Sequence, residues 1–143
     1  MITEEQKKLV QDSWAKIAPA YDKAVRLFYN RLFELDPSLR KLFAVDMERQ
    51  ERKLTATMSV IVKGLLHLEA LIPAVRELGR RHSSYGVQFD HYGTVGEALI
   101  WALDKSLNQD FTSEVREAWT DTYAHLAEVM KNAAGQSPVT TMA

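Results

Sequence analysis

His82 is the residue whose position in this sequence most needs a chemical explanation. It shares one predicted helical face with Val75, Leu78 and Tyr85, so its imidazole is expected to face the protein interior. A buried imidazole without a hydrogen-bond partner costs about 1–3 kcal/mol, so its nitrogens need partners. The simplest interpretation is a core histidine bonded to a backbone carbonyl, which is the more common role of a single buried histidine.

A second polar residue leads an apolar stripe on another predicted helix. Gln50 lies one turn before Leu54 and two turns before Met58. If the two faces enclose a flat apolar cofactor, His82 can supply a neutral imidazole to haem iron, and Gln50 can face the opposite, ligand-binding side. Tyr29 is a further amphipathic residue, whose hydroxyl either bonds a core carbonyl or has a functional role. The residues alone leave both interpretations open.

Other patterns that carry chemistry do not occur in the sequence. It has no G-x-S-x-G motif and no phosphate-binding glycine loop, and His67, His91 and His125 lack metal-ligand spacing. Lys53 and Arg81 each adjoin a candidate face and are interpreted as solvated surface charges. The basic run beside Lys53 alternates with acidic residues and is interpreted as a solvated helix flank: Glu48, Arg49, Glu51 and Arg52.

The composition limits the class of protein. The 143 residues include no cysteine, which excludes disulfides, thiolate zinc sites and a covalently attached c-type haem. Lys and Arg number 18 against 19 Asp and Glu, and this balance argues against nucleic acid or an anionic membrane as the main partner. No apolar run is long enough to span a bilayer, and residues 1–11 are too polar for a signal peptide. We expect one soluble, cytoplasmic domain.

The apolar spacing is helical throughout, and no stretch alternates as a strand would. Six or seven amphipathic helices joined by short connections predict an all-α fold. The first begins with a capping box at Thr3 and Gln6 and ends at Pro19. A short helix is predicted from Asp36-Pro37 to Leu42-Phe43, and a long helix over about 48–69. Three further helices are predicted to start at Pro73, Asp90 and Thr112. The last of them is predicted to end at Gly135, with 136–143 as a frayed tail.

Taken in chain order, these segments resemble a globin. The similarity is to single-domain bacterial haemoglobins related to the globin domains of flavohaemoglobins, and to neuroglobin in the last two helices. It covers about residues 3–132 and is carried by an ordered set of segments rather than by one motif. The segments are 28–33, Asp36-Pro37, Leu42-Phe43, Gln50 with Leu54, 78–82, 92–97, and Ala118-Trp119 with Tyr123.

The resemblance implies a role for each matching position. His82 corresponds to the proximal iron ligand, and Phe43 to the phenylalanine that wedges against the haem. Tyr29 corresponds to the distal tyrosine of bacterial haemoglobins, and Gln50 to the residue that is often a distal histidine. The other implied contacts are distal Phe28 and Leu54, propionate partners Lys53 and Arg81, and proximal Leu78, Tyr85, Val87, Tyr92 and Val95.

The resemblance also implies a function. A globin domain over residues 1–134, with six to eight helices around non-covalent haem b, would reversibly bind O2, CO or NO at ferrous iron. A phenol O–H and an amide N–H facing bound O2 are each worth about 0.5–3 kcal/mol, which implies high O2 affinity. We therefore expect O2 binding, storage or scavenging.

Two departures limit what is carried over to this chain. Flavohaemoglobins place a glutamate late in the last helix, where Ala134 stands here, although Tyr92 and Tyr123 match. The chain also lacks the length and the fingerprint of a nucleotide-binding reductase. A self-sufficient enzyme is therefore not expected. The alternatives are a nitric oxide dioxygenase served by an external reductase, a haem-based sensor, and a haemless helical interaction module in which His82 is a core residue.

Overall fold

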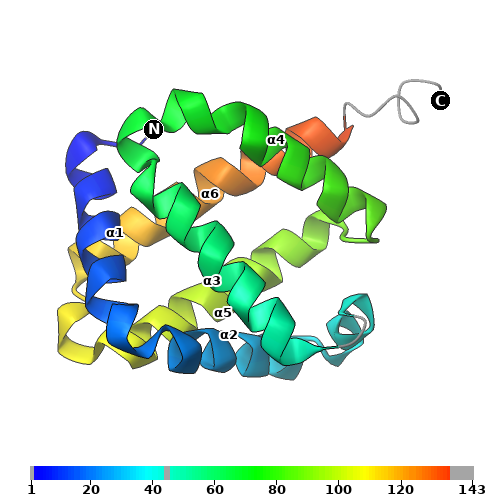
Figure 1. Cartoon of the computed structure of the whole chain (residues 1–143), viewed down its shortest axis with the longest axis horizontal. Helices are drawn as coiled ribbons and strands as arrows, with labels where there is room; N and C mark the ends of the chain where they lie inside the picture. The colour runs from blue at the N-terminus through cyan, green and yellow to red at the C-terminus, as the bar shows by residue number, and fades with distance from the viewer. Residues whose placement is uncertain (1, 44–45, 136–143) are drawn as a thin grey trace.

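The computed structural model describes residues 2–43 and 46–135, and in these residues every regular element is helical (Figure 1). The α-helices are α1 (Glu4–Ile17), α2 (Tyr21–Leu35), α3 (Met47–Lys63), α4 (Leu68–Ser84), α5 (Phe89–Leu107) and α6 (Ser113–Gly135). Short 3-10 helices connect several of them: η1 (Ala18–Ala20), η2 (Pro37–Leu42), η3 (Leu65–His67) and η4 (Asn108–Asp110). The all-α prediction is confirmed, and the predicted tail 136–143 lies outside the described residues.

Side chains that bond free backbone N–H groups determine where several helices begin. Thr3 and Gln6 form the predicted capping box at α1. The Asp36 carboxylate accepts from Ser38 N–H at 3.1 Å, and Pro37 then opens η2 as expected. Thr112 accepts from Val115 N–H at 3.2 Å at the start of α6. These starts could be predicted because each depends on residues within one turn.

Three predicted boundaries are wrong. The long helix predicted over 48–69 ends at Lys63, because Gly64 and η3 turn the chain so that the segment Leu65–Ser84 is bent by 59° from α3. Pro73 lies inside α4 rather than at its start, since α4 begins at Leu68 beyond that corner. Asp90 does not cap α5; the His91 ring accepts from Gln88 N–H at 2.9 Å, and Asp90 lies in the first turn.

The helices pack as a bundle in which α6 lies against α4 and α1, while α2 lies against α5 (Figure 1). One apolar cluster, the tryptophan cluster, joins α1 to α6 and contains Val10, Trp14, Ile17, Leu65 and Trp119. Inside it, Trp119 Nε1 donates to Ser13 Oγ at 2.8 Å. A second cluster joins α2, η2 and α5 and contains Val25, Phe28, Tyr29, Leu32, Leu39, Ala98 and Ala102.

Helices α4 and α6 cross at Gly79. A Cβ built on this glycine would lie 2.4 Å from the Met130 carbonyl oxygen and 2.6 Å from its Cα. Only a residue without a side chain allows this approach. Since His82 follows three residues later on the same helix, the crossing fixes how far α4 stands from α6 where it presents His82.

Among the residues with described structure, no single helix combines the length and apolarity needed to cross a bilayer. The bent pair of Met47–Lys63 with Leu65–Ser84 meets the two criteria only when both halves are taken together.

Candidate functional site

His82 lies in the last turn of α4 and is half-buried. Its Nδ1 is 2.7 Å from the Leu78 carbonyl oxygen, so Nδ1 carries the proton and donates to that carbonyl. Within the described part of the chain, Nε2 makes no hydrogen bond. The bond to Leu78 is what the core interpretation requires, and it also fixes the tautomer in which Nε2 keeps a lone pair for a metal.

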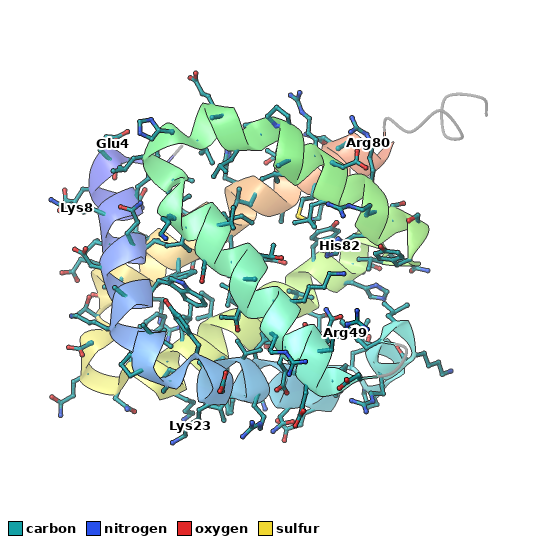
Figure 2. All side chains as sticks on the ribbon, in the orientation of Figure 1. Glu4, Lys8, Lys23, Arg49, Arg80 and His82 are labelled. Carbon is teal, nitrogen blue, oxygen red and sulfur yellow. The ribbon has the colours of Figure 1, made fainter. Side chains whose placement is uncertain are left out.

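The surroundings of His82 favour the neutral ring. Burial lowers its pKa, and the positive charges of Arg81 and Lys53 lower it further, while the Leu78 bond acts in the opposite direction. Lys53 belongs to α3 and Arg81 to α4, so the two cations reach the histidine from separate helices. A neutral imidazole is the form that can bind iron. Figure 2 shows His82 on the part of α4 that faces α3 and α5.

Tyr29 and Gln50 are brought together from α2 and α3. Gln50 Nε2 donates to the Tyr29 hydroxyl oxygen at 3.2 Å. Tyr29 is 4% exposed, and its burial raises its pKa to about 12, although the Gln50 bond works against this rise. Tyr29 is therefore a neutral phenol at physiological pH. Because its oxygen already accepts from Gln50, its own proton is free to be donated elsewhere.

Aromatic rings surround this pair. The Tyr29 ring centroid lies 5.0 Å from that of Phe28 and 5.4 Å from that of Phe43, both in edge arrangements. Phe43, at the end of η2, also meets Phe33 at 5.6 Å. The structure thus places predicted Phe28, Tyr29, Phe43 and Gln50 in one group, built from α2, η2 and the first turns of α3.

The predicted apolar lining is only partly covered by protein. Leu54 and Val95 are half-buried and pack against the second cluster, and Leu78 is half-buried on α4. A cavity of about 200 Å³ between α3 and α4 is lined by residues that include Leu78 and Arg81. Leu54 on α3, Leu78 on α4 and Val95 on α5 therefore each keep some apolar surface that the protein does not cover.

The remaining predicted contacts differ in burial. Tyr92 is buried, and Tyr123 Oη donates to the Tyr92 carbonyl oxygen at 2.6 Å. Val87 is half-buried, and its N–H donates to the His82 carbonyl oxygen at 3.0 Å. Tyr85 is 61% exposed at the end of α4. Lys53 and Arg81 are exposed, which is compatible both with solvated surface charges and with propionate partners.

Two features were missed by the sequence analysis. Gly79 positions α4 against α6, and its signal was an isolated glycine inside a helical pattern. A groove of about 870 Å³ also lies between α5 and α6, and residues such as Trp101 and Tyr123 line it. Its lining residues include the predicted proximal contact Tyr92 but not His82, Tyr29 or Gln50, so none of the residues predicted to face the iron lines it.

Comparison with known proteins agrees with the fold. A model of the globin family matches residues 26–130. The chain is 30% identical to a flavohemoprotein of Vibrio cholerae over 132 residues, which are 90% of this chain but 34% of that protein, so it spans about a third of its length. It is 29% identical to neuroglobin of Danio rerio, with 90% of each chain covered.

A solved structure agrees over the whole chain. It is an engineered carbene transferase from Rhodothermus marinus that is described as a candidate nitric oxide dioxygenase, with a TM-score of 0.87, 27% identity and complete coverage of both chains. The family match, the relatives and this shared fold agree with one another. The chain belongs to the globin family.

Proposed function

We propose that this globin is a haem b protein that reversibly binds O2, and also CO and NO, with high affinity, and that it stores or scavenges O2. The observation that carries the proposal is the Nδ1–Leu78 bond, which leaves a neutral His82 with Nε2 available. The donor set fits haem, because one imidazole is the axial ligand that globins use.

The chain's own residues supply the rest of such a site. Haem b, when bound, supplies a ferrous iron with one position for a diatomic gas. His82 Nε2 would hold the iron, and Lys53 and Arg81 would hold the carboxylates of the group. Leu54, Leu78 and Val95 would cover its apolar faces and exclude water. Oxidation of ferrous iron is slowed where water is kept away.

Tyr29 and Gln50 would determine how tightly the gas is held. The Gln50 amide holds the Tyr29 oxygen in place at 3.2 Å, so the phenol proton is the donor available to a polar ligand. A hydrogen bond to a partly charged acceptor is worth about 0.5–3 kcal/mol. That range corresponds to a slowing of O2 release by about 0.4 to 2 decades from this donor.

Absorption spectra of the purified protein test the proposal. Ferric, ferrous and CO-bound spectra should show bound haem, with a five-coordinate ferrous form before CO is added. His82→Ala should lose the iron bond and most of the haem, whereas His125→Ala, an exposed position on α6, should keep both. A normal five-coordinate ferrous spectrum in His82→Ala would remove the assignment, and a wild type without haem would favour the haemless helical module.

A nitric oxide dioxygenase served by an external reductase is the second candidate. It is supported by the similarity to a flavohemoprotein and to a structure described as a candidate nitric oxide dioxygenase. Ala134 puts a methyl group where flavohaemoglobins have a carboxylate, so strong activation of His82 is not expected. With NADH alone, the isolated protein should consume one equivalent of NO and then stop, and an added flavin reductase should restore consumption. An NO electrode with successive additions measures this, and sustained consumption with NADH alone would contradict the dependence on a reductase.

A further inference from the structure

Two segments of this chain, one of which contains His82, carry an excess of positive charge. Residues 40–53 and 76–82 contain eight Lys and Arg against four Asp and Glu, although the whole chain has a formal net charge of −1. The remainder of the molecule is therefore net acidic. We call the following exposed residues the cationic rim: Arg40, Lys41, Arg49, Arg52, Lys53, Arg80 and Arg81.

The structure brings the rim together from three elements. Arg81 adjoins His82 in the last turn of α4, and Lys53 lies on α3, from where its charge lowers the pKa of His82. Element η2, which carries Arg40 and Lys41, reaches the end of α4, since a Cβ built on Gly86 would lie 3.4 Å from Leu42 Cδ2. In Figure 2, Arg49 and Arg80 lie on the His82 side of the molecule.

Most of these cations are not neutralised by the protein. In residues 2–43 and 46–135, Arg80 is the one rim residue with an ion pair, to Glu77 at 3.3 Å. Arg40 lies over the Phe33 ring at 5.2 Å, which leaves its charge in place. The two segments have a net charge of +4, from eight Lys and Arg and four Asp and Glu. If Lys53 and Arg81 hold the two carboxylates of haem b, a net charge of +2 remains. This excess is available to a negatively charged partner.

We propose that the cationic rim docks the acidic surface of a flavoprotein that returns the iron to the ferrous state. The proposal rests on the proposed haem function, since a redox partner needs an electron acceptor near His82. Each contact transfers one electron from the reduced flavin, which is oxidised by one electron, to ferric iron, which is reduced to ferrous. Asp46, Glu48 and Glu51 alternate with the rim cations and would repel a uniformly anionic polymer or membrane, but they suit the mixed charges of a protein surface.

Charge reversal on the rim, with a matched reversal elsewhere, tests this. Arg49→Glu/Arg52→Glu changes two exposed positions in the first two turns of α3, where acidic residues suit the helix dipole. Lys8→Glu/Lys23→Glu makes the same change of net charge on α1 and α2, far from His82 (Figure 2). Both variants should keep the wild-type spectra and gas affinity, which separates docking from haem binding.

Two measurements use flavodoxin, a small acidic FMN protein, as the probe. The first is the rate at which reduced flavodoxin reduces the ferric protein. At about 10 mM ionic strength the rim variant should be slower by about ten-fold or more, and the control should change by less than about two-fold. In wild type, the rate should fall by a similar factor at about 500 mM, where charges are screened within a few ångström. The second is the Kd for oxidised flavodoxin, a complex in which no electron is transferred. The Kd should rise most in the rim variant and change little in the control variant.

Each outcome decides the proposal. Equal effects of the rim and control reversals, or a wild-type rate and Kd that are insensitive to salt, would overturn it. A third outcome is that the wild-type protein binds phosphatidylglycerol vesicles, measured by co-sedimentation, more tightly than it binds flavodoxin. This result would assign the rim to a membrane and would also overturn the proposal. If the protein holds no haem, the proposed function fails, and the Kd series with oxidised flavodoxin still decides whether the rim docks an acidic protein.

Discussion

At one end of the molecule, Trp14 and Trp119 are 6% and 3% exposed, and Trp119 also donates a hydrogen bond to the buried hydroxyl of Ser13. At the other end, Leu54, Leu78 and Val95 are equally apolar but remain half-buried. The tryptophan cluster is complete with protein atoms alone. The second region has apolar surface that the protein does not cover, and burial of such surface by a ligand is favourable by about 25 cal/mol per Å².

This difference separates stability from binding. Substitutions in the tryptophan cluster should lower the free energy of unfolding of the apoprotein, because the packing there is part of the fold. Substitutions around His82 should act mainly on ligand binding and little on the stability of the apoprotein. Ligand binding adds to stability by mass action only when the ligand is present. Four predictions test this contrast, in order of decreasing effect.

The largest effect is expected in the tryptophan cluster. Trp119→Ala removes a buried ring and the partner of Ser13, so the free energy of unfolding of the apoprotein should fall by about 3–5 kcal/mol. Urea unfolding measures this. Trp101→Ala is the matched control, since that indole is only half-buried on α5, where it packs against the second cluster and has Arg31 and Lys105 over its ring. A loss in Trp101→Ala as large as that in Trp119→Ala would contradict the contrast.

Gly79 should come next. Gly79→Ala places a methyl group against the backbone of Met130, which cannot rotate away, so the free energy of unfolding should fall by about 1–3 kcal/mol and α4 should move. Gly93 on α5 is the control, since a Cβ built there meets nothing within 4 Å. Gly93→Ala should therefore stabilise the protein by about 0.5–1 kcal/mol. The same sign for both substitutions would show that the α4–α6 crossing is not tight.

A smaller effect is expected at Tyr29. Tyr29→Phe keeps the ring packing and removes the phenol proton, so O2 should be released about ten-fold faster, or about 1.4 kcal/mol. CO release should change much less, because bound CO accepts hydrogen bonds weakly. Stopped-flow rates for both gases, with exposed Tyr85→Phe as the control, measure this. Equal changes for O2 and CO would mean that Tyr29 acts through shape rather than polarity.

The smallest effect concerns pH. The pKa of His82 is below its ordinary value because the ring is buried, so the folded apoprotein binds its proton less readily than the unfolded chain does. The contribution to stability is therefore present above about pH 6.5 and is lost as the pH falls through the pKa of the folded state. His82→Leu should show a smaller loss of unfolding free energy between pH 7.5 and pH 5 than wild type. An unchanged pH dependence would contradict this sign.

The sequence could predict what depends on neighbouring residues or on helical period. The caps at Thr3, Asp36 and Thr112 and the burial of Tyr29 belong to this class. The α3–α4 corner was missed because Gly64 and η3 depend on packing from other helices, which overrides the usual preference for proline at a helix start.

Within the candidate site, the resemblance named His82, Tyr29 and Gln50, but not how they interact. The Gln50 side chain donates its hydrogen bond to the Tyr29 hydroxyl oxygen. The sequence does not determine this partner, because it depends on the side-chain torsions of two residues on different helices. The Leu78 bond of His82 joins residues one turn apart and was foreseeable as a carbonyl contact. Which ring nitrogen makes that bond could be known only from the folded backbone.

Pro73 gives α4 an uneven resistance to local unfolding. Because proline has no N–H, the Glu69 carbonyl loses its normal helical partner, and the first turns of α4 are weaker than the part held at Gly79. Amide hydrogen exchange of residues 68–72 should therefore proceed through small fluctuations, while the amides of α1 and α6 exchange only when the tryptophan cluster separates. The first turns of α4, between α3 and His82, can therefore unfold locally to admit a group as large as haem while the rest of the bundle stays folded.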